Sequence, residues 1–254
     1  MNIAVCVKQI PDQSVPGKLD PVTHNLVRDG KLILDDSDSY GVEMALQLVD
    51  RAGGGEVTLI SMAPNSEVSG LRTALAMGAA KAVLVSDPSL AGSDALTTAK
   101  VLAAAISRNP FDLVMAATES TDGYTGTVPV QVAEVLDIPS VSFAKKVDVE
   151  DGVLKVQRQT ESGYDEVECS LPALVSVTAG VVEPRYPSFK GIMAAKSKPV
   201  EILDVAGLGI GPLTVGQEIV SVRAAEERAS GTVVVDEGDG YLKIVEFLES
   251  IKVI

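Results

Sequence analysis

The stretch from Phe111 to Leu136 holds the residues with the clearest potential for chemistry in this sequence. An apolar run over 113–117 is followed by a polar loop over 118–127, and then by apolar residues at helical spacing with Pro129 near the start. This pattern predicts a strand, a loop and a helix. Backbone N–H groups in the first turn of a helix have no partner inside it, so they could bind the phosphate of a nucleotide. An ordinary strand-to-helix connection, with small residues for turning, fits this loop alone equally well.

Other patterns that carry chemistry are missing. The single histidine, His24, lies in a polar stretch with no nucleophile paired to it in the sequence, and we interpret it as solvated. There is no GxSxG, no GxxxxGK[ST], no CxxC and no GxGxxG after the first apolar run. We interpret the acidic pairs Asp35-Asp36 and Glu226-Glu227 as solvated surface. These features predict a binding protein without catalytic side chains and without a metal site.

The composition narrows the class of partner. The chain has 254 residues and a net charge of −14, which argues against nucleic acid or an anionic membrane as a partner. Cys6 and Cys169 lie far apart and suggest neither a disulfide framework nor a metal site. The opening residues lack the features of a signal peptide, and no run approaches the roughly 20 apolar residues of a membrane helix. We therefore expect a cytoplasmic protein that is not inserted in a membrane.

Strands and helices are predicted to alternate over the first 140 residues. The expected strands are 3–7, 57–62, 82–85 and 113–117; the first helix is expected to begin at Asp38 or Ser39, and later ones to lie over 71–78 and 96–106. This order predicts an α/β fold with a doubly wound, mostly parallel sheet. The stretch 12–34 has no clear period, and a loop of that length is more often functional than idle. With a strand order of 3-2-1-4-5, the end of the first strand would face the 117–128 loop, where ligands bind in such sheets.

The pattern changes after Pro139. Strand-like segments joined by turns at 151–152 and 162–163 predict added β-hairpins, and one more apolar strand follows over 172–177. We expect an α/β domain over 1–198 and, over 199–254, an extended C-terminal arm that ends in an amphipathic helix and packs on another protein.

A basic segment over 184–196 stands out in this acidic chain. Cations beside exposed apolar residues would suit a protruding site that docks a partner protein, although an amphipathic turn laid over the core is the alternative. The residues expected to contact the partner are Arg185, Tyr186, Phe189, Lys190, Ile192, Met193 and Lys196.

The sequence resembles the beta subunit of electron transfer flavoprotein. The matching pieces are 7–12 (VKQIPD), 71–79 (LRTALAMGA), 119–123 (ESTDG) and 183–196 (EPRYPSFKGIMAAK). The resemblance implies an adenine-nucleotide α-hydrolase-like, Rossmann-like fold, and a heterodimer with an alpha subunit that holds most of a redox-active FAD. It also implies AMP, or a second FAD in electron-bifurcating members, bound at the strand ends of this subunit.

The site residues follow from matching positions. Adenine and ribose contacts would fall on Cys6, Asp35 and Met62, and phosphate contacts on the loop. The full candidate set is Cys6, Asp35, Met62, Ala117, Thr121, Asp122, Gly123, Tyr124, Thr125, Gly126, Thr127 and Val128. Familiar members have Asn-Gln-Thr where Gly126-Thr127-Val128 stand here, a change that keeps the backbone amides and leaves only Thr125 and Thr127 as side-chain donors.

The resemblance also implies a function in electron transport. The segment 184–196 is similar to the family's recognition loop, with Phe189 at the position of its anchoring leucine. Electrons would enter from acyl-CoA or related dehydrogenases, as in fatty acid oxidation, reside on FAD and leave to a quinone oxidoreductase. Because the flavin carries the chemistry, an electron carrier needs no catalytic side chains. One alternative is a free-standing universal-stress-like nucleotide-binding module, which has no use for the docking segment. The other, an ATP-pyrophosphatase-like enzyme, would need a Ser-Gly-Gly-rich loop where 8–11 stand.

Overall fold

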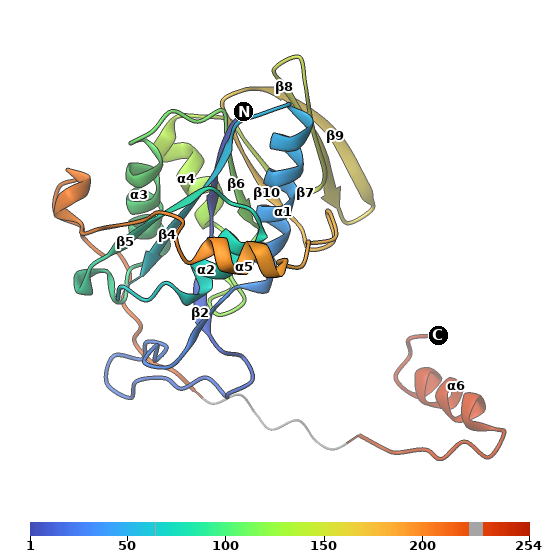
Figure 1. The fold of residues 1–254 in the computed structure, drawn as a ribbon. Helices are drawn as coiled ribbons and strands as arrows, with labels where there is room; N and C mark the ends of the chain where they lie inside the picture. Colours follow the sequence, from blue (N-terminus) through green and yellow to red (C-terminus); the bar gives the residue numbers. More distant parts are fainter. Residues whose placement is uncertain (64, 224–230) are drawn as a thin grey trace. The chain divides into compact units, whose positions relative to one another are not determined.

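A nine-stranded sheet runs through the larger part of the chain (Figure 1). The structure is a computed structural model that describes residues 1–63, 65–223 and 231–254. From one edge to the other the strands are β11 (Val200–Leu203), β5 (Lys81–Ser86), β4 (Glu56–Ala63), β1 (Asn2–Cys6), β6 (Leu113–Ala117), β10 (Ala173–Val177), β7 (Ser140–Glu150), β8 (Val153–Thr160) and β9 (Gly163–Ser170). Among the strand pairs described within this sheet, β7–β8 and β8–β9 are antiparallel and the others are parallel. The predicted mostly parallel α/β sheet with added hairpins is confirmed.

Helices cover both faces of this sheet. The helices beside it are α1 (Asp36–Arg51), α2 (Ser69–Met77), α3 (Ala95–Ile106), α4 (Val128–Leu136) and α5 (Phe189–Ala195). Successive side chains of a strand point to opposite faces, so Ile3 and Val5 pack in one core with α1 and α2, while Ala4 packs in the other with α3 and α4. The sheet is therefore doubly wound.

The strand order places two carboxyl ends together at the centre. The first four strands of the expected order 3-2-1-4-5 are found as β5-β4-β1-β6, so the order reverses between β1 and β6. The strand beyond β6 is β10, because the chain makes the β7–β9 hairpins first and then returns between β6 and β7. A crevice at the carboxyl ends of β1 and β6 is where an open parallel sheet binds its ligand.

The stretch 12–34 is mostly loop, as expected, with short strands at its borders. β2 (Gln9–Pro11) and β3 (Leu32–Leu34) pair antiparallel in a separate two-stranded sheet. Three-residue strands are too short for a period to be read from sequence, which is why only the loop was predicted.

The start of α1 corrects two expectations. The N-cap is Asp35, whose carboxylate accepts a hydrogen bond from Ser37 N at 3.0 Å, and neither Asp38 nor Ser39 caps the helix. Asp36 is exposed but Asp35 is fully buried, so the interpretation of this pair as solvated surface is wrong for Asp35. The pair Glu226-Glu227 lies outside the described residues.

The C-terminal part divides differently from the expected 1–198 and 199–254. The chain separates into one unit over 1–219 and another over 220–254. Residues after 199 belong to the first unit, because β11 adds to the sheet edge beside β5 and is followed by the short 3-10 helix η2 (Ala206–Leu208). The second unit contains α6 (Gly240–Ser250), which exposes Tyr241, Ile244 and Phe247. None of the helices in the described ranges is long and apolar enough to cross a membrane.

Candidate functional site

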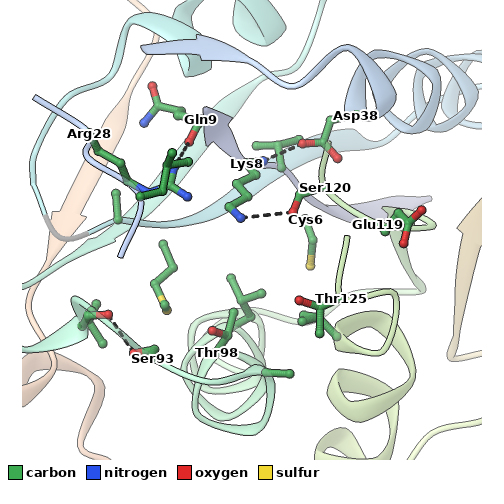
Figure 2. A pocket seen from close by; sticks show the side chains of 18 of the residues that line it. Cys6, Lys8, Gln9, Arg28, Asp38, Ser93, Thr98, Glu119, Ser120 and Thr125 are labelled. Carbon is green, nitrogen blue, oxygen red and sulfur yellow. Dashed lines mark hydrogen bonds between the residues drawn. The ribbon is translucent and has the colours of Figure 1, made fainter. Parts of the chain in front are cut away.

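A cavity of about 660 Å³ lies at the carboxyl ends of β1, β4 and β6 (Figure 2). Cys6, Met62 and Ala117 end these three strands or lie next to their ends, and all three line the cavity. The first turns of α3 and α4 complete the wall with Ala95, Thr98, Val128 and Pro129, and the 12–31 loop contributes Asn25 and Arg28. The cavity therefore lies where the strand order reverses.

The two helices that begin at this cavity differ at their N-termini. Asp94 caps α3, because its carboxylate accepts a hydrogen bond from Thr97 N at 2.7 Å. Thr127, the N-cap of α4, makes no side-chain cap. Among the hydrogen bonds of the described residues, none uses the backbone N–H of residues 125–128 as donor. The first turn of α4 thus offers open donors and the positive end of a helix dipole to an anion.

The loop before α4 is held from both sides. The carboxylate of Asp35 accepts hydrogen bonds from Thr121 N at 2.7 Å and Thr121 Oγ1 at 3.1 Å. Asp122 forms ion pairs with Lys8, at 2.6 Å, and with Arg28 of the 12–31 loop. Burial would raise the pKa of Asp122, but the two cations hold that pKa below its usual range. The candidate phosphate loop is therefore fixed in place by side chains from three separate segments.

Two titratable groups of the cavity wall, Cys6 and Asp38, favour their neutral forms. Burial, together with the nearby Asp38 carboxyl, raises the pKa of the Cys6 thiol to about 12. Burial also raises the pKa of Asp38 well above its usual range, although its Oδ2 accepts a hydrogen bond from Lys8 N at 2.6 Å. The uncharged thiol of Cys6 and the thioether of Met62 suit an uncharged ring, whereas the α4 N-terminus suits an anion. The cavity therefore offers groups for an uncharged ring and for an anion.

The structure brings half of the twelve predicted nucleotide residues to the cavity wall. Those that line it are Cys6, Met62, Ala117, Thr125, Gly126 and Val128. Asp35, Thr121 and Asp122 instead hold the loop, and Gly123, Tyr124 and Thr127 lie on that loop away from the lining. The sequence reasoning missed Lys8, Gln9, Asn25, Arg28, Asp38, Ser93, Thr98, Glu119 and Ser120, which also line the cavity. The unusual length of the 12–34 loop pointed toward Asn25 and Arg28, and the VKQIPD piece at 7–12 pointed toward Lys8 and Gln9.

The predicted docking segment, residues 184–196, contains α5. Tyr186, Phe189, Ile192 and Met193 are all exposed there, and Phe189 is 80% exposed. Lys190 and Lys196 are exposed as well. Arg185 is different, because its guanidinium pairs with Glu43 of α1 at 2.6 Å. The segment therefore presents an apolar face on a short helix.

The fold and this site define a class of protein. A doubly wound, Rossmann-like sheet with a cavity at its point of reversal, and with an uncapped helix N-terminus facing that cavity, is the arrangement of α/β proteins that bind nucleotides.

Comparisons with known proteins give the family within this class. The family described as Electron transfer flavoprotein domain matches residues 10–208. Electron transfer flavoprotein subunit beta of Mycobacterium bovis is 37% identical over 264 aligned residues, which cover 100% of this chain and 99% of the relative. The same subunit of Thermoanaerobacterium thermosaccharolyticum is 41% identical over 212 residues, covering 83% and 81%. Caffeyl-CoA reductase-Etf complex subunit CarD of Acetobacterium woodii is 38% identical over 218 residues, covering 85% and 83%.

The chain belongs to the family of electron transfer flavoprotein beta subunits. Membership implies a flavin-associated electron carrier and an alpha subunit as partner. The resemblance noted in the sequence is confirmed.

Proposed function

We propose that this chain is the beta subunit of a heterodimeric electron transfer flavoprotein that accepts electrons from acyl-CoA or related dehydrogenases. The electrons reside on FAD held mostly by the alpha subunit, and they leave to a quinone oxidoreductase. The setting is the cytoplasm. The flavin supplies the redox chemistry, and this chain supplies a bound nucleotide, a docking surface and part of the subunit interface.

The cavity of this subunit holds AMP or the AMP part of a second FAD. The observation that carries this assignment is the uncapped N-terminus of α4, whose open amides face the cavity at the end of a loop fixed by Asp35 and Asp122. A phosphate at residues 125–128 would satisfy these donors. The neutral groups around Cys6 and Met62 would receive the base and ribose.

The electron donor docks on the segment 184–196. Four exposed apolar side chains on and before α5, with Lys190 and Lys196 beside them, suit an apolar pocket with an acidic rim on the donor. The Acetobacterium woodii relative is named as a subunit of a caffeyl-CoA reductase complex, which supports a CoA-linked dehydrogenase as the donor for this chain.

Residues 220–254 pack on the alpha subunit. In α6 the apolar residues Leu242, Ile244, Val245 and Phe247 are exposed to between 40% and 60% within this unit. A helix with that much exposed apolar surface is stabilised when a partner covers it.

The test is co-expression with the alpha subunit encoded in the same genome, followed by a flavin spectrum and chromatography of the extracted nucleotides. The expected result is a heterodimer that contains FAD together with one AMP or one additional FAD. A monomer that hydrolyses ATP, or a heterodimer without flavin, would contradict the proposal.

A matched pair of variants tests the phosphate position. Thr127→Asp places a carboxylate at the α4 N-cap, so it should keep the helix stable while it excludes a phosphate. Val130→Asp adds the same charge to the exposed side of the same first turn. We expect Thr127→Asp to purify without the cavity nucleotide and Val130→Asp to retain it. Equal retention of the nucleotide by the two variants would contradict a phosphate at the N-terminus of α4.

A further inference from the structure

The docking segment, residues 184–196, is held against the rest of the protein at both ends. At its N-terminal end the anchor is the buried carboxylate of Glu43. Glu43 lies in α1 and is only 3% exposed. Its Oε2 accepts hydrogen bonds from Arg185 Nε at 2.6 Å and Arg185 N at 3.2 Å, and its Oε1 accepts one from the guanidinium at 3.1 Å. Gln47 Nε2 donates a fourth hydrogen bond, at 2.8 Å. Both the side chain and the backbone of Arg185 are therefore fixed on α1.

We propose that Glu43 is a positioning residue for electron-donor docking and that Arg185 is its anchor rather than a cation that contacts the donor. This inference rests on the proposed function of the segment 184–196. It changes the role of a residue that sequence reasoning placed in the docking surface.

The charge balance at Glu43 supports an anchoring role. Burial alone would raise the pKa of Glu43, but the hydrogen bonds from Arg185 and Gln47 hold that pKa below its usual range. A buried carboxylate is tolerated only when it is paired, and a two-point contact with a guanidinium fixes orientation as well as charge. The contact thus fixes where the chain enters the docking segment.

The C-terminal end of the docking segment is held by α2 and by Ala79 just after it. Arg72 donates from one guanidinium nitrogen to Ala195 O and Lys198 O, both at 2.7 Å. Lys198 Nζ donates to Leu75 O at 2.8 Å and Ala79 O at 2.7 Å, which places a cation at the negative end of α2. The chain leaving α5 is thereby tied to α2 by its backbone and by a side chain.

Between the anchors, α5 lies directly on α2. A Cβ at Gly191 would come within 2.5 Å of Ala76 O, so only glycine permits this approach. Ser188 caps α5 by accepting a hydrogen bond from Gly191 N at 3.0 Å. With this side fixed, Phe189, Ile192 and Met193 remain exposed for a partner. A face that is already ordered loses less conformational entropy on docking, so the anchors should raise the affinity for the donor.

Two roles for Arg185 make opposite predictions, since its side chain is 40% exposed and could also reach a partner. An anchor acts through Glu43, so loss of either residue should have the same effect, and loss of both should add little. A direct contact acts through the cation, so Glu43→Gln should leave docking intact while Arg185→Met weakens it and reduces its salt dependence.

The experiment uses the full heterodimer and an acyl-CoA dehydrogenase as the donor. The variants are Glu43→Gln, Arg185→Met, their double variant and Arg185→Lys, which keeps the charge but loses the two-point contact. Arg51→Met is the matched control, because Arg51 also lies on α1 and pairs with Asp148 at 2.5 Å, away from the docking segment. The readouts are KM for the flavoprotein, kcat, salt dependence, and hydrogen exchange of the amides in 189–195.

We expect Glu43→Gln and Arg185→Met each to raise KM about tenfold with kcat unchanged, and the double variant to match the single ones. Arg185→Lys should be intermediate, and the salt dependence should stay that of the wild type. Amide exchange in α5 should be faster in the first two variants and unchanged in Arg51→Met. Wild-type KM in Glu43→Gln, or unchanged exchange in α5, would overturn the inference. If the wild type accepts electrons from no dehydrogenase, the proposed function fails, and hydrogen exchange still decides whether Glu43 fixes the segment.

Discussion

Asp35 and Thr121 lie 86 residues apart in sequence and are joined by two hydrogen bonds, from Thr121 N and Thr121 Oγ1 to the Asp35 carboxylate. The same carboxylate caps α1 through Ser37 N. One buried side chain therefore sets the start of a helix and the position of the loop that precedes α4. The geometry of the proposed phosphate site depends on this link.

Asp35→Asn should loosen the loop. An amide can still cap α1, but its NH₂ group would face the Thr121 N–H donor, so one buried donor loses its acceptor. We expect a loss of about 1–3 kcal/mol in the free energy of unfolding and weaker retention of the cavity nucleotide. Urea unfolding and nucleotide extraction measure the two effects. The exposed neighbour provides the control, since Asp36→Asn should change stability by less than about 0.5 kcal/mol. Equal effects of the two substitutions would contradict the role of Asp35.

Asp122→Asn should remove the ionic contact that joins the 118–127 loop to Lys8 and Arg28. Because the Asp122 side chain is 7% exposed, we expect a loss of about 1–3 kcal/mol at pH 7. The pKa of Asp122 is held below its ordinary value of 3.8, so its contribution is complete above that pH and declines as the pH falls through the folded-state pKa. Urea unfolding at several pH values should show a constant gap between wild type and variant above pH 3.8, and a narrowing gap below it. A gap that instead changes between pH 5 and 7 would point to another group.

Asp38→Asn should have the opposite pH signature. Burial raises the pKa of Asp38 well above 3.8 in the folded state, so the folded protein binds more protons than the unfolded chain between these two pKa values. Wild-type stability should therefore fall as the pH rises through that window. The variant is always neutral, and its amide oxygen can still accept from Lys8 N. We expect its advantage in melting temperature to grow from pH 4 upward and then level off. An advantage that is independent of pH would contradict this prediction.

Cys6 should react slowly with alkylating reagents although it lines the cavity. A pKa of about 12 leaves roughly one thiolate in ten thousand at pH 8, and the thiolate is the reactive form. The rate of modification by iodoacetamide, followed by mass spectrometry, should rise about tenfold for each pH unit below the pKa. In urea the same residue should react at the rate of an ordinary cysteine. Fast modification of folded protein with a plateau below pH 9 would contradict the prediction.

Short-range patterns were enough to predict much of this fold. The strand over 113–117 and the helix that contains Pro129 were predicted at their observed positions, because burial on both faces makes a continuous apolar run and helical spacing marks one buried face. The same holds for the hairpins after Pro139. Strand β11 has only four residues, which is too few for a strand to be predicted from its pattern. Its place at the edge beside β5 depends on the rest of the sheet.

The sequence by itself determined the alternation of strands and helices, the open first turn at Pro129 and the cluster of cations and apolar residues over 184–196. These features depend on neighbouring residues, so local spacing reveals them. Only the tertiary structure decided which of two adjacent aspartates is buried, since Asp35 meets Thr121 and Asp36 meets solvent. It also decided that Arg185 faces Glu43 across 142 residues. Such pairings arise from strand order and helix packing, which bring together residues that are far apart in the sequence. No regular spacing in the sequence marks them.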